Sequence, residues 1–275
     1  MTTGEPIQAR FLAKSPTRLI CQQIPGAFGI VHKWSHYSKQ YGRISAILRY
    51  IGRRFPQVWP LVGRRATSSY LKRWSRESDT KILNLGGGGN LAQEWLTADV
   101  DPRADVFIDC SETLPFGDCM IDGLVLEEVI EHLGYLQGLQ LLKECKRVLK
   151  GDGQLRLSTP DFSWFAELQS KPISAAIEDA TRDFESREGR RFLETDNAPA
   201  QLIRAAALNS IFLSHGHKFV YSSESLEQLL YLAGFSFRRS IYQDTDSMLA
   251  WTDTHADRFN HPPEISMYYD AWKHA

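Results

Sequence analysis

The 275-residue sequence predicts an α/β protein built on a mostly parallel sheet with an antiparallel end strand. From residue 81 onward, short apolar runs alternate with helical patterns, which is typical of strands joined by helices. The first of these runs ends in four consecutive glycines, residues 86–89. The composition, 43% hydrophobic and 24% charged, is that of a globular protein, so we expect a packed core.

Residues 1–80 are predicted to form a basic helical N-terminal extension. They hold 14 Lys or Arg against three acids, whereas residues 81–275 hold 18 basic and 30 acidic side chains. Apolar residues at helical spacing form one stripe that ends at Pro56: Tyr37, Tyr41, Ile44, Leu48, Ile51 and Phe55. We favour a helix packed over the following domain with a solvated basic rim. Peripheral contact with anionic lipid or an acidic substrate stays open as the alternative. Nucleic acid is not expected, because no recognisable binding module accompanies the charge.

The remaining elements follow from periodicity. Apolar runs predict strands at 81–85, 97–100, 106–108, 121–126 and 154–158, and two further strands at 235–242 and 265–272. Helices are expected at 136–149, with Gly151 beyond the end, and at 223–232, between a Ser222 or Ser223 cap and Gly234. Residues 162–213 interrupt this alternation and are predicted to form a helical insert.

The cysteines and the N-terminus indicate the compartment. None of the four cysteines forms a C-x-x-C pair, so neither a zinc ribbon nor a disulfide framework is predicted. A signal-peptide pattern and an apolar run long enough to span a bilayer are both missing from the sequence. We therefore expect a cytoplasmic protein, with a peripheral membrane location as the open alternative. His32 and His36 lack a third ligand, so no metal site is predicted.

Residues 82–90 read ILNLGGGGN, a strand followed by a glycine-rich turn, which is typical of nucleotide-cofactor domains. A P-loop is excluded because no lysine follows the glycines. A dinucleotide fingerprint is excluded because Leu91 stands where its third glycine belongs, which disfavours a dehydrogenase. What remains is Asn84-x-Gly86-x-Gly88, with Asp99 at the end of the next strand.

This pattern resembles the first motif of the class I S-adenosylmethionine-dependent methyltransferases. Residues 95–133 are similar in order and spacing to the type-11-like branch of that family, including the family's "LEHL" ending at Glu131-His132. Residues 147–162 resemble its helix-turn-strand segment, and residues 216–235 resemble relatives from polysaccharide biosynthesis clusters. The resemblance spans about 81–272. It implies a Rossmann-like class I fold in which residues 81–275 form the cofactor-binding methyltransferase domain.

The resemblance also implies how S-adenosyl-L-methionine is bound. Asp99 would accept hydrogen bonds from both ribose hydroxyls. Asp109 would accept one from the adenine amino group, with the backbone amide of Cys110 on a ring nitrogen.

Other residues would bind the methionine end of the cofactor. Gly86 and Gly88 would let the backbone approach the methionine moiety. Asn84 stands where the family usually has an acid, and Glu127 would face the sulfonium.

For function, the resemblance implies O-methylation of a sugar or glycan hydroxyl. A hydroxyl acceptor needs a base, for which His215, His217 and Asp161 are candidates. Packing roles for the two histidines and a helix cap for Asp161 stay open. So do two other functions: a natural-product small-molecule methyltransferase, and a non-catalytic scaffold. Glu128, which stands where relatives often have histidine, and a short first helix within 90–97 keep the scaffold open.

Overall fold

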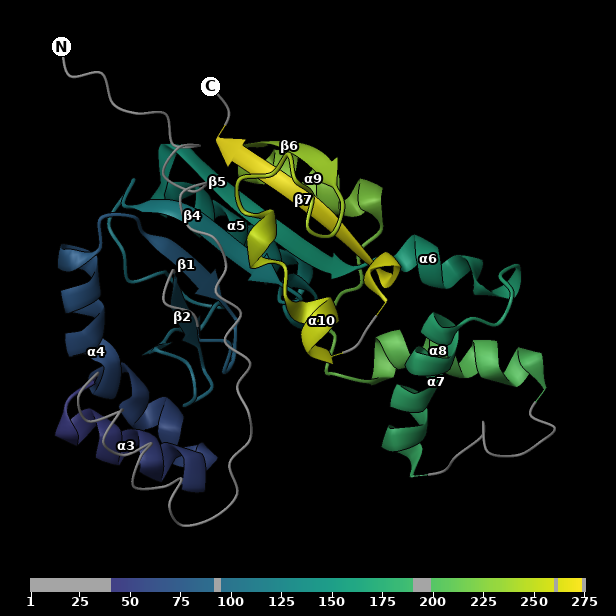
Figure 1. Ribbon diagram of the computed structural model, residues 1–275, viewed down its shortest axis with the longest axis horizontal. Helices are drawn as coiled ribbons and strands as arrows, with labels where there is room; N and C mark the ends of the chain where they lie inside the picture. Colours follow the sequence, from purple (N-terminus) through teal and green to yellow (C-terminus); the bar gives the residue numbers. More distant parts are fainter. Residues whose placement is uncertain (1–40, 92–94, 190–198, 260–261, 274–275) are drawn as a thin grey trace.

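A computed structural model describes residues 41–91, 95–189, 199–259 and 262–273. Within these ranges a seven-stranded sheet has the order β3-β2-β1-β4-β5-β7-β6 (Figure 1). The strands are β1 (Ile82–Leu85), β2 (Leu96–Asp99), β3 (Val106–Phe107), β4 (Ile121–Glu127), β5 (Leu149–Pro160), β6 (Phe235–Ser240) and β7 (Ser266–Lys273). β7 pairs antiparallel with both β5 and β6, and the other pairs are parallel. The Rossmann-like sheet is therefore confirmed, and its antiparallel strand, last in the chain, lies one place in from the edge.

Helices follow one another along the described ranges, between the strands and in the insert. In chain order they are α3 (Arg43–Arg54), η1 (Pro56–Val58), α4 (Trp59–Glu77), η2 (Ile130–His132), α5 (Tyr135–Val148), α6 (Phe162–Ala166), η3 (Glu167–Gln169), α7 (Ala175–Glu188), α8 (Ala200–Leu213), α9 (Ser223–Ala233), η4 (Ala250–Thr252), α10 (His255–Phe259) and η5 (Pro263–Ile265). The predicted cap of α9 is confirmed: the Ser222 hydroxyl accepts from the Ser225 amide, and Gly234 ends the helix in a left-handed conformation. The stripe residue Tyr37, the pair His32 and His36, and the middle of the short first helix lie outside the described residues.

Alternation along the strands separates the two faces of the sheet. Leu124 and Leu126 of β4 join a large core with buried side chains of α5 and α9 and half-buried ones of α4. Val125, between them, faces the opposite side and packs with Leu249 from the segment that precedes α10. The sheet is therefore covered by helices on one face and by the 241–259 segment on the other.

A buried ion network fastens that segment to the sheet. The guanidinium of Arg156 on β5 lies 2.6 Å from a carboxylate oxygen of Asp253 and 3.1 Å from one of Asp270 on β7. All three side chains are almost completely buried. Because an unpaired buried charge is strongly unfavourable, this network fixes how residues 241–259 lie against β5.

The buried face of α3 differs from the predicted apolar stripe. Ser45, Ala46, Arg49 and Gly52 are buried, while Ile44 is 76% exposed. The guanidinium of Arg49 donates to the backbone carbonyls of the loop before β3 and lies 4.0 Å from the ring centroid of Tyr41. Of the predicted stripe, Tyr41 is buried and Leu48 packs against the cluster around Trp59, whereas Ile44 and Phe55 are exposed. The stripe is thus only partly the packed face, because Arg49, which lies off the stripe, is buried to satisfy these carbonyls.

α4 packs against β3, so residues 59–77 share contacts with the sheet. The Thr67 hydroxyl accepts a hydrogen bond from the Phe107 amide at 3.1 Å, and Trp59 packs edge-on against the Phe107 ring. A side chain at Gly63 would collide with that ring, since its Cβ would lie 2.6 Å away. The boundary predicted at residue 80 therefore marks a change in the sequence pattern. Residues before and after it nevertheless pack against one another.

The helical insert forms α6, η3, α7 and α8, which project from the end of the sheet where β5 and β7 lie (Figure 1). Phe165, Leu168, Ile177 and Ile211 form a small core of its own. Residues 190–198, between α7 and α8, are outside the described ranges. The insert thus adds a separate wall next to the carboxyl end of β5.

Candidate active site

The carboxyl ends of β2, β1 and β4 lie side by side and carry the motif residues. β1 neighbours both strands, so the chain order reverses direction at β1. Ligands of open α/β sheets bind at the carboxyl edge beside such a switch point. The glycine turn follows β1, Asp99 ends β2 and Glu127 ends β4. The topology therefore brings these predicted cofactor residues to one edge.

Only part of the glycine turn is open. A Cβ at Gly86 would lie 2.5 Å from Val129, and one at Gly87 would lie 2.5 Å from Asn84. At Gly88 no atom would lie within 4 Å, and its φ of +56° is rarely adopted by other residues. Its amide donates to Asp99 at 2.8 Å. Gly88 is therefore where a ligand can approach the backbone, whereas Gly86 and Gly87 are required by packing.

Asn84 lies beneath the turn and is almost completely buried. Its Oδ1 has no hydrogen-bond partner among the described residues. The open Gly88 lies in the turn and this orphaned acceptor lies on β1 directly before it, which fits a polar ligand at the position predicted for the methionine end of the cofactor.

Asp99, Asp109 and Cys110 gather at the ends of β2 and β3. Asp99 also accepts from the Asp101 amide at 2.9 Å, and Asp109 accepts from the amide and hydroxyl of Ser111. Burial and the charges of Asp99 and Asp109 raise the pKa of the Cys110 thiol to about 12. The thiol is therefore protonated at neutral pH and does not act as a nucleophile.

Glu127 is held by a segment that sequence reasoning missed. Its carboxylate accepts from the amides of Thr254 and His255, at 2.5 and 2.6 Å, and from the Thr254 hydroxyl. That hydroxyl also accepts from the Asn90 side chain at 3.0 Å. Thr254 just before α10 has the pattern of a helix cap, but only the tertiary structure places it between β4 and the glycine turn.

Glu128 has a strained backbone at the end of β4. Its φ is +55°, and its carboxylate accepts from the Ser158 hydroxyl at 2.9 Å. Burial and the nearby charge of Glu127 raise the pKa of the Glu128 carboxyl to about 7. Left-handed conformations of residues other than glycine often occur at functional sites. The sequence signalled this position only as a departure from the family pattern.

Three histidines meet beyond β4. The ring centroids of His132 and His217 are 5.1 Å apart, and those of His215 and His217 are 5.8 Å apart. His217 donates from Nδ1 to the Ile211 carbonyl at 2.6 Å, and burial lowers its pKa to about 4. His215 pairs with Asp183 of α7 at 3.2 Å, which raises the pKa of the imidazole. The predicted histidines are thus brought together, with His132 and Asp183 as partners that sequence reasoning did not assign.

Asp161, the third predicted base, is occupied by other contacts. One of its oxygens accepts from the Ser163 amide at 2.9 Å and caps α6. The other lies 3.0 Å from the guanidinium of Arg239. These contacts match the alternative of a helix cap, and its role as a base stays a prediction.

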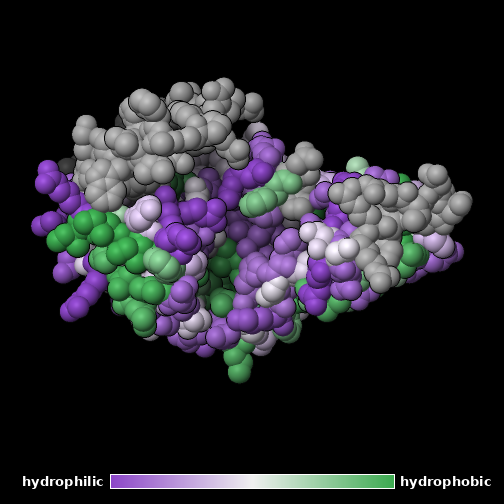
Figure 2. Space-filling model, turned by 90° about the horizontal axis from the view of Figure 1, so that it is seen from below, coloured by the Kyte–Doolittle hydropathy of each residue, from purple (hydrophilic) through white to green (hydrophobic). Residues whose placement is uncertain are grey.

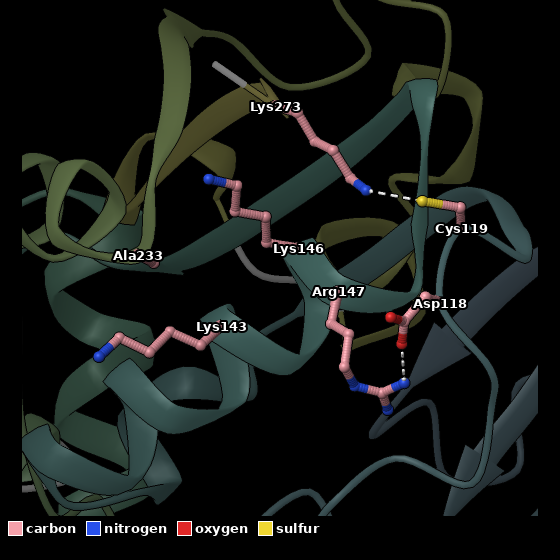
Figure 3. Close-up of a pocket in the computed structure, with 7 residues that line it drawn as sticks. All are labelled: Asp118, Cys119, Lys143, Lys146, Arg147, Ala233 and Lys273. Carbon is pink, nitrogen blue, oxygen red and sulfur yellow. Dashed lines mark hydrogen bonds and ion pairs between the residues drawn. The ribbon is translucent and has the colours of Figure 1, made fainter. Parts of the chain in front are cut away.

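A basic cavity of about 350 Å³ lies away from these residues (Figure 3). It is lined by Asp118, Cys119, Lys143, Lys146, Arg147, Ala233 and Lys273. Asp118 and Cys119 precede β4, so the cavity opens at the amino-terminal edge of the parallel strands. It is therefore separate from the glycine turn.

Comparison with known proteins agrees with the motif. A family model described as a methyltransferase domain, of type 11, matches residues 85–157. This part of the chain is therefore similar to a class I S-adenosylmethionine-dependent methyltransferase domain of the type-11 family. Two proteins of Mycobacterium tuberculosis, from strains CDC 1551 and H37Rv, are both named "Probable S-adenosylmethionine-dependent methyltransferase". Each is 37% identical over 73 residues, which is 26% of this chain and 26% of the relative. The match thus spans about a quarter of the length of these curated relatives.

Solved structures show only a distant similarity to this chain. A SAM-dependent methyltransferase from Archaeoglobus fulgidus has a TM-score of 0.43 and 14% identity, with 88% of this chain and 100% of that chain covered. An S-adenosylmethionine-dependent methyltransferase from Mesorhizobium loti has a TM-score of 0.42 and 16% identity, with coverage of 76% and 99%.

Proposed function

We propose that this chain is an S-adenosylmethionine-dependent methyltransferase that methylates a hydroxyl group of a sugar or glycan. The observation that carries the proposal is the open turn at Gly88, whose amide is held by Asp99 at the carboxyl edge of the sheet. When bound there, S-adenosyl-L-methionine supplies an activated methyl group. Asp99 and Asp109 would hold its nucleoside, and Gly88 with Asn84 its amino-acid end.

A hydroxyl acceptor requires a group that takes its proton. The pair of His215 and Asp183 has the geometry of a base with an orienting carboxylate. Among the three predicted bases, His215 is exposed and has this orienting partner. The proposal therefore assigns the proton to His215, with Asp183 as a positioning residue.

Two exposed aromatic rings, at the start and near the end of the insert, support an acceptor with apolar faces, such as a sugar ring. Phe162, which follows β5, is 37% exposed, and Phe212 near the end of α8 is 47% exposed. Their ring centroids are 6.3 Å apart. Exposed apolar groups of this kind often mark ligand sites.

Calorimetric titration with S-adenosylhomocysteine tests the cofactor, with NADH as control. Micromolar binding of S-adenosylhomocysteine alone supports the proposal, and no binding overturns it.

Methyl transfer from labelled cofactor to a panel of sugars, lipid-linked glycans and phenols then tests the acceptor. For the sugar, Phe212→Ser should raise KM at least fivefold, while Phe259→Ser on α10 should not. Turnover only on phenols would favour a natural-product enzyme, and binding without turnover a scaffold.

We also propose that α3 and α4 contact an anionic lipid surface. Residues 41–76 hold nine Lys or Arg and no acid. Five large apolar side chains of these two helices and the turn between them are at least 45% exposed: Ile44, Ile47, Tyr50, Phe55 and Leu61. Figure 2, seen from the side of α3, has a hydrophobic area at its left, bordered by hydrophilic side chains. Apolar side chains among cations suit insertion between anionic headgroups. None of the described helices is long and apolar enough to cross a membrane.

Sedimentation with vesicles tests this contact. Binding to phosphatidylglycerol-containing vesicles, but not to pure phosphatidylcholine, is expected, and salt should weaken it. The double variant Ile44→Ser, Leu61→Ser should lose binding, whereas Leu136→Ser, at an exposed position of α5, should not. Equal binding to both kinds of vesicle would overturn the lipid assignment. Self-association of the wild-type protein that the same double variant abolishes would overturn it as well.

A further inference from the structure

Three metal-binding side chains converge between the end of β4 and the end of the insert. One ligand atom each from Glu131, His132 and His217 lies within 4.8 Å of the others. Glu131 and His132 belong to η2, and His217 follows α8. The Glu131 carbonyl accepts from the amides of Lys218 and Phe219, at 2.8 and 3.1 Å. Backbone hydrogen bonds therefore hold the two segments together independently of the side chains.

Glu131 has a buried oxygen that lacks a partner. Its side chain is 1% exposed, and Oε2 accepts from the Thr159 hydroxyl at 3.0 Å. Oε1 has no hydrogen-bond partner among the described residues. A buried carboxylate oxygen without a donor or cation is unfavourable. Glu131, which the metal-ligand cluster contains, thus has a buried oxygen without a hydrogen-bond partner among the described residues.

Both imidazoles make a hydrogen bond to the backbone. His217 donates from Nδ1 to the Ile211 carbonyl at 2.6 Å, which leaves Nε2 with its lone pair. His132 makes a hydrogen bond to the backbone of Gly216. Metal-binding histidines almost always donate their second nitrogen to a carbonyl or carboxylate. The supporting hydrogen bonds of a metal site are therefore already in place.

We propose that Glu131, His132 and His217 bind one divalent transition-metal ion, with zinc as the best-suited ion. Two imidazole nitrogens and one carboxylate oxygen are ligands that zinc accepts, and three protein ligands leave a position open. Ligand atoms about 2.1 Å from a tetrahedral ion are about 3.4 Å apart, so ligand atoms that lie within 4.8 Å of one another would close by up to about 1.4 Å. Rotation of the two half-buried imidazoles can supply this movement.

The open position gives the ion a role that rests on the proposed function. A metal ion lowers the pKa of a bound hydroxyl. His215, whose ring lies 5.8 Å from that of His217, is placed to accept the released proton. The ion would therefore bind and activate the acceptor hydroxyl, while the cofactor is held by the separate glycine turn.

Metal analysis of the full chain tests the site. After dialysis against zinc and removal of free ion, one zinc per chain is expected. Cobalt substitution should give the visible absorption of a tetrahedral site. His217→Ala and Glu131→Gln should each weaken zinc affinity at least tenfold in competition with a chromophoric chelator. His255→Ala, a histidine outside the cluster, should leave that affinity unchanged.

Binding of S-adenosylhomocysteine separates the two proposals. The His217→Ala protein should bind it as the wild type does, which also shows that the chain is folded. Wild-type protein that binds S-adenosylhomocysteine but no zinc overturns the metal site alone. Zinc that stays bound in both cluster variants overturns it as well. Zinc binding without any S-adenosylhomocysteine binding would overturn the proposed function and leave the metal site in place.

Discussion

Replacing Asp99 tests the role of the carboxylate at the end of β2. In the structure the two carboxylate oxygens accept from the amides of Gly88 and Asp101. The same oxygens are proposed to accept the two ribose hydroxyls. Hydrogen bonds to a charged group contribute about 1.5–3 kcal/mol each. Asp99→Ala removes two of them from the complex, so about 3–6 kcal/mol of binding free energy is lost.

Since 1.4 kcal/mol is a factor of ten, the affinity of Asp99→Ala for S-adenosylhomocysteine should fall roughly 100-fold to 10,000-fold. Asp99→Asn keeps one acceptor and should lose about 10- to 100-fold. Titration calorimetry measures both, with a thermal melt to separate binding from unfolding. The matched control is Asp101→Asn, at the same strand end, whose carboxylate pairs with the exposed Arg103. An Asp99→Ala affinity within threefold of the wild type would refute the reasoning.

Three further predictions concern stability. Gly86→Ala places a Cβ 2.5 Å from Val129 at a φ of +74°, so it should cost about 1–3 kcal/mol in urea denaturation, and adding Val129→Ala should recover part of that loss. Arg156→Met leaves two buried aspartates without their cation and should cost about 3–5 kcal/mol, whereas a surface Arg→Met change should cost less than about 1 kcal/mol. Hydrogen bonds from Arg147 hold the pKa of the Glu144 carboxyl below its ordinary value of 4.5. Because the pKa is lower in the folded state, this stabilisation is complete above pH 4.5 and is lost as the pH falls through the folded value. Glu144→Gln should therefore flatten the decline of the urea midpoint between about pH 5 and pH 3, and an unchanged slope would contradict it.

Strands and their order of appearance could be predicted because their signals are local. β4 is a run of apolar residues bounded by polar ones, and β1 ends at a glycine turn that only a few ligand classes explain. Even so, the predicted β5 was too short at its start, which lies at Leu149, because Gly151 and Gly153 have the pattern of a turn. In the sheet, pairing of Leu149 and Gln154 with β4 outweighs that local preference.

The buried face of α3 could not be predicted from periodicity. An apolar stripe indicates the packed face only when the surface it meets is apolar. In this protein the partner is a loop whose backbone carbonyls need donors, so Arg49 is buried and Ile44 is exposed. No local pattern signals that exchange, since it depends on residues more than 50 positions away in the chain.

By itself, the sequence determined the α/β class, the glycine turn and Asp99 at the next strand end, because each depends on neighbours close in the chain. Tertiary structure alone decided that Gly88 is the open glycine, that Thr254 binds Glu127, and that His217 meets Glu131. These contacts join segments up to 128 residues apart, and their geometry is set by how the sheet, the insert and α10 pack. Local sequence preferences cannot specify such a contact between distant residues. The contact forms only when the core and its buried hydrogen bonds form together.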